Sequence, residues 1–353
     1  MAANSGNFEI CQFIIDNIAE KNPKNDTGLT LLHLAASKGH FEICDLILKN
    51  ADDKNPEDWV NGLTPLHAAA QSEHILVFQL IFDKVEIKNP KLKRGYSLLH
   101  DAAYRGHTEI CIFIIDRLEE KNPVDDHGNT PLHEAASKGH LKICQHVIEN
   151  VNDKNPGNFQ GNTPLHYTAL SGNLEIYQYL INNVNDKNPK NNNGATPLHV
   201  AAEHGHLGIC QIIIENVDNK NPKKNNGITP LHAAAGNGYF EIFQLISEYV
   251  KDKNPKDNRG TTPYHKAAFH GHLGICKYII GHVGDENPKD SYGRTPLHIA
   301  AILGHLDVCK LICQNIVDKH PKDNLGRTPF DYASDDRQDI KNLFSQFLPN
   351  QFY

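Results

Sequence analysis

Histidine and cysteine are the residues of this chain with the most versatile chemistry, since both bind transition metals and both serve in catalysis. The 353-residue chain holds 22 histidines and 8 cysteines. Nine of the histidines recur every 33 residues, after a first step of 34, and these are His33, His67, His100, His133, His166, His199, His232, His265 and His298. A residue that returns in nearly every copy of a repeat is expected to stabilise each copy, not to build a single reactive site.

Most of the other histidines also follow the repeat. Seven stand seven residues after members of the first set, and these are His40, His74, His107, His140, His206, His272 and His305. His204 and His206, which flank a glycine, could hold a metal ion, but no nearby cysteine or carboxylate completes a ligand set. His133-Glu134 begins like a zinc-protease motif, yet Ser137 stands where the second histidine belongs. We therefore predict neither a metal site nor a cofactor.

The cysteines occupy a packing position. Seven of them follow Ile or Val at one equivalent point of the repeat, and these are Cys11, Cys44, Cys111, Cys144, Cys210, Cys276 and Cys309. In other copies this position holds Phe78, Tyr177 or Phe243, which could not replace a metal ligand or a nucleophile. We expect buried, inert thiols. Unpaired cysteines favour a reducing intracellular compartment, either cytoplasmic or nuclear. No glycine-rich phosphate loop and no Gly-x-Ser-x-Gly motif is present, so an enzyme is the least favoured class.

Each repeat carries the signals of two short helices. Thr130 is a good N-cap and Pro131 suits the first helical position. Gly139 is expected to end this helix in the left-handed conformation. The apolar spacing predicts a second helix over Leu141–Asn150, with Asn150 closing it in the left-handed conformation that asparagine tolerates.

The repeated pattern Thr-Pro-Leu-His-x-Ala-Ala-x-x-Gly-His, at a period of 33 residues, resembles the ankyrin repeat over essentially the whole chain. The resemblance implies an all-α solenoid of about 11 helix-turn-helix units with projecting β-hairpin loops, or fingers. It also implies a concave surface made of fingertips and first helices. The repeated histidines would bridge the turn backbones of adjacent units.

The chain departs from the family pattern at several points. Glu73 replaces the glycine between the helices of its unit and should weaken that turn, and one residue is inserted within 57–62. Proline follows the hairpin asparagine, as in Asn122-Pro123, and should stiffen the finger edges. The first unit is partial, which leaves open whether the chain is a fragment of a longer protein. The last unit carries a polar cap that includes Asp331, Asp335 and Asp336.

We predict a single domain over residues 1–353. Its unit boundaries are 1–23 (partial), 24–56, 57–90, 91–123, 124–156, 157–189, 190–222, 223–255, 256–288, 289–321 and 322–353 (cap).

Charge and hydropathy limit the partners. The net charge is −7, and the lysine rows around each Asn-Pro alternate with aspartates such as Asp153 and Asp257. We expect a solvated, salt-bridged face there and no nucleic-acid binding. The apolar runs are too short to span a membrane and no secretory signal is visible, so we expect no membrane insertion. The chain is expected to be a monomer.

Function should reside where the units differ, at the fingertips and on the first helices. The candidate partner-binding residues are Trp59, Arg94, Tyr96, Tyr104, Arg105, Phe159, Tyr167, Arg259, Phe269, Tyr292 and Arg294. Tryptophan, tyrosine and arginine are the residues most often found as interface hot spots. The favoured patch runs from Trp59 to Tyr167, although some of these aromatics could instead pack along the fingers.

The resemblance thus predicts a protein–protein interaction scaffold or adaptor that binds a partner domain or peptide. Two alternatives stay open: the regulatory ankyrin region of a larger protein, such as a channel or multidomain enzyme, or an effector of a pathogen or symbiont.

Overall fold

The computed structural model describes residues 2–334 and 337–347. Asp335 and Asp336 of the predicted polar cap lie outside the described residues. The chain divides into two compact units, residues 1–185 (unit 1) and 186–353 (unit 2), and each is described by itself. Among the described residues, no helix combines the length and apolar character needed to cross a lipid bilayer.

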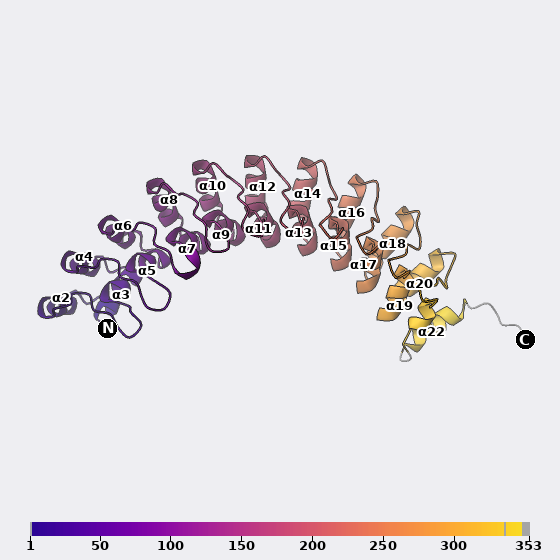
Figure 1. The fold of residues 1–353 in the computed structure, drawn as a ribbon, viewed down its shortest axis with the longest axis horizontal. Coiled ribbons are helices and arrows are strands. Elements are labelled where there is room, and N and C mark those ends of the chain that lie inside the picture. Colours follow the sequence, from indigo (N-terminus) through magenta and orange to yellow (C-terminus); the bar gives the residue numbers. More distant parts are fainter. Residues whose placement is uncertain (1, 335–336, 348–353) are drawn as a thin grey trace, which may run out of the picture. The chain divides into compact units, whose positions relative to one another are not determined.

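Unit 1 consists of paired helices in two layers (Figure 1). The first-helix layer holds α1 (Ala2–Ser5), α3 (Leu31–Ser37), α5 (Pro65–Gln71), α7 (Leu98–Arg105), α9 (Pro131–Lys138) and α11 (Pro164–Ser171). The second-helix layer holds α2 (Phe8–Asn17), α4 (Phe41–Asn50), α6 (Ile75–Lys84), α8 (Thr108–Arg117), α10 (Leu141–Asn150) and α12 (Leu174–Asn183). A short 3₁₀ helix, η1 (Lys93–Gly95), precedes α7.

Unit 2 repeats the arrangement (Figure 1). Its first helices are α13 (Pro197–His204), α15 (Pro230–Asn237), α17 (Pro263–His270), α19 (Pro296–Leu303) and α21 (Pro329–Tyr332). Its second helices are α14 (Leu207–Asn216), α16 (Phe240–Tyr249), α18 (Leu273–His282), α20 (Leu306–Asn315) and α22 (Gln338–Ser345). The predicted all-α solenoid of helix-turn-helix units is confirmed.

Local signals set the helix ends, as α9 and α10 show. Thr130 has extended backbone, and Pro131 follows it as the first residue of α9. Gly139 ends α9 with a φ of 87°, as predicted. The core between the layers takes Ile143, Cys144, Val147 and Ile148 from α10, each at most 1% exposed. All eight cysteines are free and buried, which confirms the packing role.

The prediction that Asn150 takes the left-handed conformation is wrong. Glu73 and Arg94 are the non-glycine residues with positive φ in the described part of the chain. Asn150 is helical, and its Nδ2 donates to the carbonyl of His146 at 2.9 Å. Because Val151 continues as extended chain, the side chain of Asn150 satisfies a carbonyl that the helix end leaves unpaired.

Most fingers, which are the turns before the first helices, are organised by one acidic or amide side chain; the finger before α7 has Leu92 at this position and is an exception. In the finger Asp125–Asn129, Oδ1 of Asp125 accepts from the backbone amides of His127 and Asn129, both at 2.8 Å. The carbonyl of Asn129 accepts from the amide of Asp125 at 2.9 Å. In place of regular strands, the described residues form two isolated β-bridges, Lys24 with Thr30 and Lys91 with Ser97. The fingers are therefore side-chain-stabilised turns.

Candidate functional site

The nine recurring histidines, here called frame histidines, stand between neighbouring repeats, and most of them hydrogen-bond to the finger of the next repeat. Nδ1 of His133 accepts from the amide of Thr130, and Nε2 donates to the carbonyl of Asn162 in the next finger, both at 3.0 Å. This geometry requires a neutral ring. Burial favours that form, because it lowers the pKa of His133 to about 4. The same bond to the finger of the next repeat is made by His33, His100, His199, His232, His265 and His298, at 2.9–3.1 Å.

The histidines of the second set bridge in the other direction. Nε2 of His140 donates to the carbonyl of Tyr104 at 3.1 Å, and His107, His272 and His305 make the equivalent bond at 2.9–3.2 Å. Within the described part of the chain, no group of three or more His, Cys, Asp or Glu residues could hold a metal ion. The hydrogen bonds of the repeated histidines agree with the structural role that the resemblance implied.

Of the expected solvated, salt-bridged lysine face, the solvent exposure is found at Lys190, Lys223 and Lys256, but the ion pairs among the described residues do not include these lysines. Lys121 Nζ donates to the carbonyl of Ile115 at the end of α8 at 3.0 Å, and Lys220 reaches the carbonyl of Ile214 at 2.6 Å. Asp153 instead accepts from the amide of Asn155 at 3.0 Å. Backbone groups at helix ends and turns lack intrahelical partners, so these charged side chains hydrogen-bond to the backbone instead of to one another.

Two exposed aromatic residues sit on the fingers of unit 1. Trp59 is 61% exposed and Phe159 is 69% exposed. Each donates its amide to a carbonyl of the preceding finger, Trp59 to Thr27 and Phe159 to His127, at 3.1 and 3.0 Å. Their rings lie against the glycine of that finger, where a side chain would clash. The rings are held in place yet remain open to solvent.

Two other candidates are committed to the fingers. The hydroxyl of Tyr167 donates to Oδ1 of Asn129 at 3.0 Å, and its ring lies edge-on to His133 with centroids 5.3 Å apart. The Tyr96 ring lies over His100 at 5.1 Å. These two tyrosines pack along the fingers, which was the alternative interpretation of the aromatic residues. They are half-buried and not free anchors.

Tyr104 and Arg105 lie on α7, which packs against α9, the helix that carries Glu134. Tyr104 is 44% exposed, and Lys138 Nζ lies 4.4 Å from its ring centroid. Arg105 Nε donates to Asp101 at 3.0 Å. Glu134, on α9, has its pKa raised to about 7 by burial and by the charge of Asp125. Glu134 occupies the variable position directly after Thr-Pro-Leu-His. This position is the sequence signal that could have identified Glu134 as a surface residue of interest.

Arg94 stands apart from this group. It is exposed, its φ is 71°, and its carbonyl accepts from the amide of Asp126 at 3.0 Å. Its unusual backbone shapes the finger before α7.

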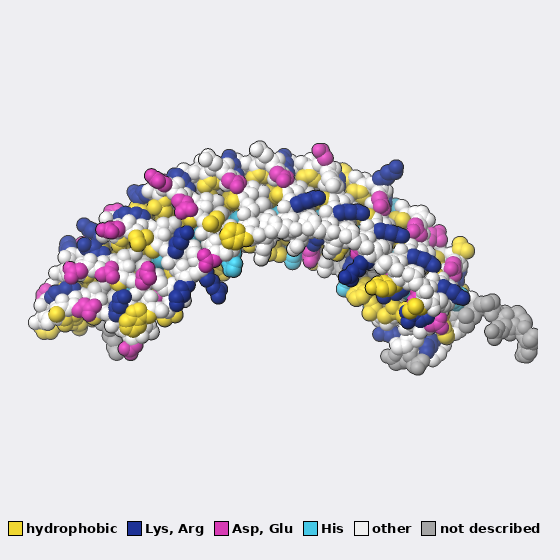
Figure 2. All heavy atoms as spheres, viewed as in Figure 1, with side chains coloured by type: hydrophobic (Ala, Val, Ile, Leu, Met, Phe, Trp, Pro, Cys, Tyr) yellow, Lys and Arg dark blue, Asp and Glu magenta, His cyan; other side chains and the backbone are white. Residues whose placement is uncertain are grey.

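In unit 2, four predicted residues line one hollow of about 230 Å³, here called the unit 2 hollow. Its lining residues are Arg259, Thr261, His265, Lys266, Phe269, Asp290, Tyr292, Arg294 and Ile299. They come from two successive fingers and from α17 and α19. Figure 2 shows hydrophobic and basic side chains together in this part of unit 2.

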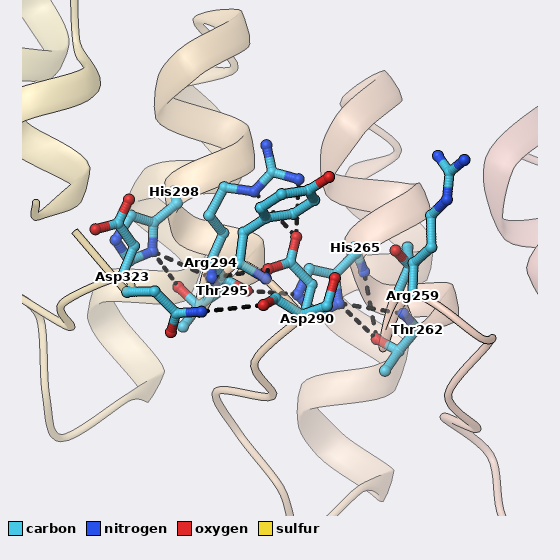
Figure 3. Close-up of polar contacts among 12 residues, drawn as sticks. Arg259, Thr262, His265, Asp290, Arg294, Thr295, His298 and Asp323 are labelled. Carbon is cyan, nitrogen blue, oxygen red and sulfur yellow. Dashed lines mark hydrogen bonds and ion pairs between the residues drawn. The ribbon is translucent and has the colours of Figure 1, made fainter.

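One ion pair organises the unit 2 hollow. Arg294 Nε and a terminal guanidinium nitrogen contact Oδ2 of Asp290 at 3.0 and 2.9 Å, and the guanidinium carbon lies 4.8 Å from the Tyr292 ring centroid. Asp290 Oδ1 accepts from the amides of Tyr292 and Arg294, both at 2.9 Å. Arg259 points away from this network (Figure 3). The hollow thus contains one fixed and one projecting arginine.

Comparison with known families supports the repeat assignment. A family model described as ankyrin repeats (3 copies) matches the chain in five overlapping segments: residues 1–91, 76–158, 143–224, 209–290 and 279–346. A search of curated proteins found no match.

Proposed function

The chain belongs to the ankyrin repeat family, and we propose that it is a scaffold or adaptor that binds a partner domain or peptide on its finger and first-helix surface. Repeats of this family are generally protein-interaction modules.

One contrast carries the proposal. The frame histidines, helix caps and packing residues recur from repeat to repeat. The variable positions of the fingers and first helices hold different aromatic and arginine side chains. Several of these remain exposed, including Trp59, Tyr104, Phe159, Phe269 and Tyr292. Exposed large aromatic residues carry a free-energy cost in water that a partner can remove. The internally bonded Tyr96 and Tyr167 contribute mainly by shaping the surface.

Affinity capture from cells of the source organism, read by mass spectrometry, tests the proposal. One variant combines Trp59→Ala, Tyr104→Ala and Phe159→Ala, and another combines Phe269→Ala and Tyr292→Ala. The matched control combines Leu76→Ala and Tyr249→Ala, which are 65% and 57% exposed on the second-helix layer. Loss of the bound proteins with either test variant, but not with the control, supports the proposal. An unchanged set of bound proteins with both test variants, folded by circular dichroism, would contradict it.

We also propose that the chain itself has no catalytic activity, needs no cofactor, binds no nucleic acid and is a monomer. The free, buried cysteines support an intracellular location, cytoplasmic or nuclear. The regulatory-region and effector alternatives use the same surface, and the division into eleven units at the boundaries given above stays a prediction.

A further inference from the structure

We propose that the unit 2 hollow binds an acidic segment of a partner protein, with a carboxylate between Arg259 and Lys266 and an apolar side chain against Phe269 and Tyr292. This inference rests on the proposed function and adds the chemistry of the partner.

Charge is distributed unevenly along the sequence. Unit 1 has 16 Lys and Arg against 24 Asp and Glu, a net charge of −8. Unit 2 has 19 against 18, a net charge of +1. A positive binding surface on a chain of net charge −7 can therefore only be local, and unit 2 is the part able to provide it.

The finger aspartates of unit 2 are engaged by backbone amides. Asp257 Oδ1 accepts from the amides of Arg259 and Thr261, both at 2.8 Å. Asp323 accepts from the amides of Leu325 and Arg327 in the same way, and Asp290 completes the series. The second oxygens of Asp290 and Asp323 pair with Arg294 and Arg327. Asp257 makes no ion pair among the described residues, so it leaves the cations near its own finger less compensated.

An exposed lysine directly precedes each finger of unit 2. These lysines are Lys190, Lys223, Lys256, Lys289 and Lys322, which recur every 33 residues. Figure 2 shows basic side chains in a row along unit 2. Lys223 and Lys289 each donate to the carbonyl of the next lysine in the row, at 3.2 and 2.9 Å, so the row is held in register. It would attract an acidic segment toward the hollow.

Two cations in the hollow are available to a ligand. Arg294 is held by Asp290, but the guanidinium of Arg259 and the ammonium of Lys266 have no partner within the described part of the chain. They come from adjacent elements, a finger and the helix α17 that follows it. A carboxylate placed between them would gain charge-assisted hydrogen bonds.

The rest of the hollow suits an apolar side chain. Phe269 is 48% exposed and Tyr292 is 61% exposed, and Ile299, at 8%, adds a nearly buried apolar surface. On the neighbouring helix α15, Gly236 lies beside Lys266, and a Cβ atom at this glycine would stand 3.8 Å from the lysine Cβ. The small residue leaves room for a ligand to approach.

A peptide fits these features better than nucleic acid does. A hollow of about 230 Å³ accommodates one or two side chains, not a series of stacked bases. The acidic character of the chain as a whole also opposes a long polyanion. A short segment that pairs one or two carboxylates with an aliphatic or aromatic residue needs only the hollow itself.

Selection from a random 12-residue peptide library displayed on phage, with the full chain as bait, tests the proposal. We expect enriched peptides that combine Asp or Glu with a large apolar residue. Fluorescence anisotropy of a selected peptide should then show binding that weakens as salt rises from 50 to 200 mM. The variant Arg259→Gln with Lys266→Gln should raise the Kd about tenfold or more. Lys251→Gln with Lys277→Gln, which removes two exposed charges elsewhere in unit 2, should change it by less than about twofold.

The outcomes separate this inference from the proposed function. Enriched peptides without acidic residues, or an acidic peptide whose Kd is unchanged by the hollow variant, would overturn the inference and leave the scaffold function standing. Absence of any enriched peptide, together with no captured protein, would count against both. Tighter binding of a 20-nucleotide single-stranded DNA than of the acidic peptide, with sensitivity to the same variant, would also overturn the inference in favour of nucleic acid.

Discussion

His67 and Asp101 lie in adjacent repeats of unit 1. Each has one buried polar atom without a hydrogen-bond partner among the described residues, Nε2 of His67 and Oδ2 of Asp101. Nδ1 of His67 accepts from the amide of Thr64 at 3.2 Å, so the neutral ring carries its proton on Nε2. Burial lowers the pKa of His67 to about 4, although the charge of Asp101 opposes this shift. The finger that follows contains η1 and the left-handed Arg94. Here Nε2 of His67 makes no hydrogen bond of normal geometry to the next repeat, although the backbone of Pro90 lies close enough to oppose the lowering of its pKa.

Because His67 lacks this bond and His232 has it, replacing each with asparagine should lower the free energy of unfolding by different amounts. Asparagine should preserve the capping role, since Asp331 fills this slot in the last unit and accepts from the amide of Thr328 at 2.7 Å. His232→Asn breaks the 3.0 Å bond to the carbonyl of Thr261, whereas His67→Asn removes an unpaired donor. We expect His232→Asn to lower the free energy of unfolding by about 1 kcal/mol more than His67→Asn, measured with urea. Equal losses would show that His67 makes a bond of similar strength.

Much of the fold could be predicted because every unit carries its own signals. Threonine, proline and glycine define α9 within the unit itself, so its bounds required no knowledge of the neighbours. The role of Asn150 was not predictable in this way. Whether asparagine turns left-handed or donates to a carbonyl depends on the extended segment after it, which the local sequence does not specify.

The frame histidines should make the fold sensitive to acid. The pKa values of His67, His133, His232 and His265 are lowered to about 4 by burial, against about 6.5 in the unfolded chain. The unfolded chain therefore binds more protons between these values, and stability should fall as pH drops below about 6.5 until about 4. Near pH 5 we expect a net uptake of about three protons on unfolding, or roughly 4 kcal/mol per pH unit. Urea unfolding at pH 7, 6 and 5 measures this slope.

Glu134 provides an internal control of opposite sign. Its pKa is raised to about 7 in the folded chain, so its contribution to stability is present below the unfolded value and is lost as pH rises through 7. Glu134→Gln should stabilise the chain at pH 8 and have little effect at pH 5. A flat stability profile between pH 7 and 5 would contradict the assignment of neutral frame histidines.

Glu73 is a site where a single substitution should stabilise the chain. Its φ is 60°, a conformation that strains a residue with a side chain, and glycine occupies the equivalent turn in other units. Glu73→Gly should raise the free energy of unfolding by about 1 kcal/mol. Its carboxylate lies 3.6 Å from His107 but is exposed, so the ion pair adds little. Glu73→Ala, which removes the carboxylate but keeps the strain, is the control and should change stability much less.

The candidate site was predictable in part. Equivalent slots of successive repeats lie side by side, so the sequence could nominate Arg259, Phe269, Tyr292 and Arg294, which the structure brings to one hollow. The sequence could not distinguish side chains that are free to bind a partner from those already hydrogen-bonded within the chain. The hydroxyl of Tyr167 finds Asn129, 38 residues earlier, and the high pKa of Glu134 arises from burial among residues of neighbouring elements. Such pairings depend on the finger geometry and leave no local pattern.

The buried thiols should be inert while the chain is folded. Burial raises the pKa of Cys44, Cys144, Cys210 and Cys276 to about 12, so almost no thiolate forms at pH 8. We expect reaction with a disulfide reagent such as DTNB to be slow in buffer and to reach eight thiols in denaturant. Rapid labelling of these four cysteines in the folded chain would contradict their packing role.

Tyr104 and Tyr167 should separate binding from stability. The Tyr167 hydroxyl donates to Asn129 and also lies 3.3 Å from Nδ2 of Asn158. Tyr167→Phe should therefore lower the free energy of unfolding by about 1 kcal/mol, and not more, because Asn158 still donates to Asn129 at 2.8 Å. Tyr104→Ala removes an exposed ring that contacts Lys138, so stability should change by less than about 0.5 kcal/mol while partner capture falls. Tyr292→Phe, at a hydroxyl without a partner among the described residues, is the matched control for Tyr167→Phe. If Tyr104→Ala instead lowers stability as much as Tyr167→Phe and leaves capture intact, Tyr104 is a structural residue and the unit 1 surface must be redrawn around Trp59 and Phe159.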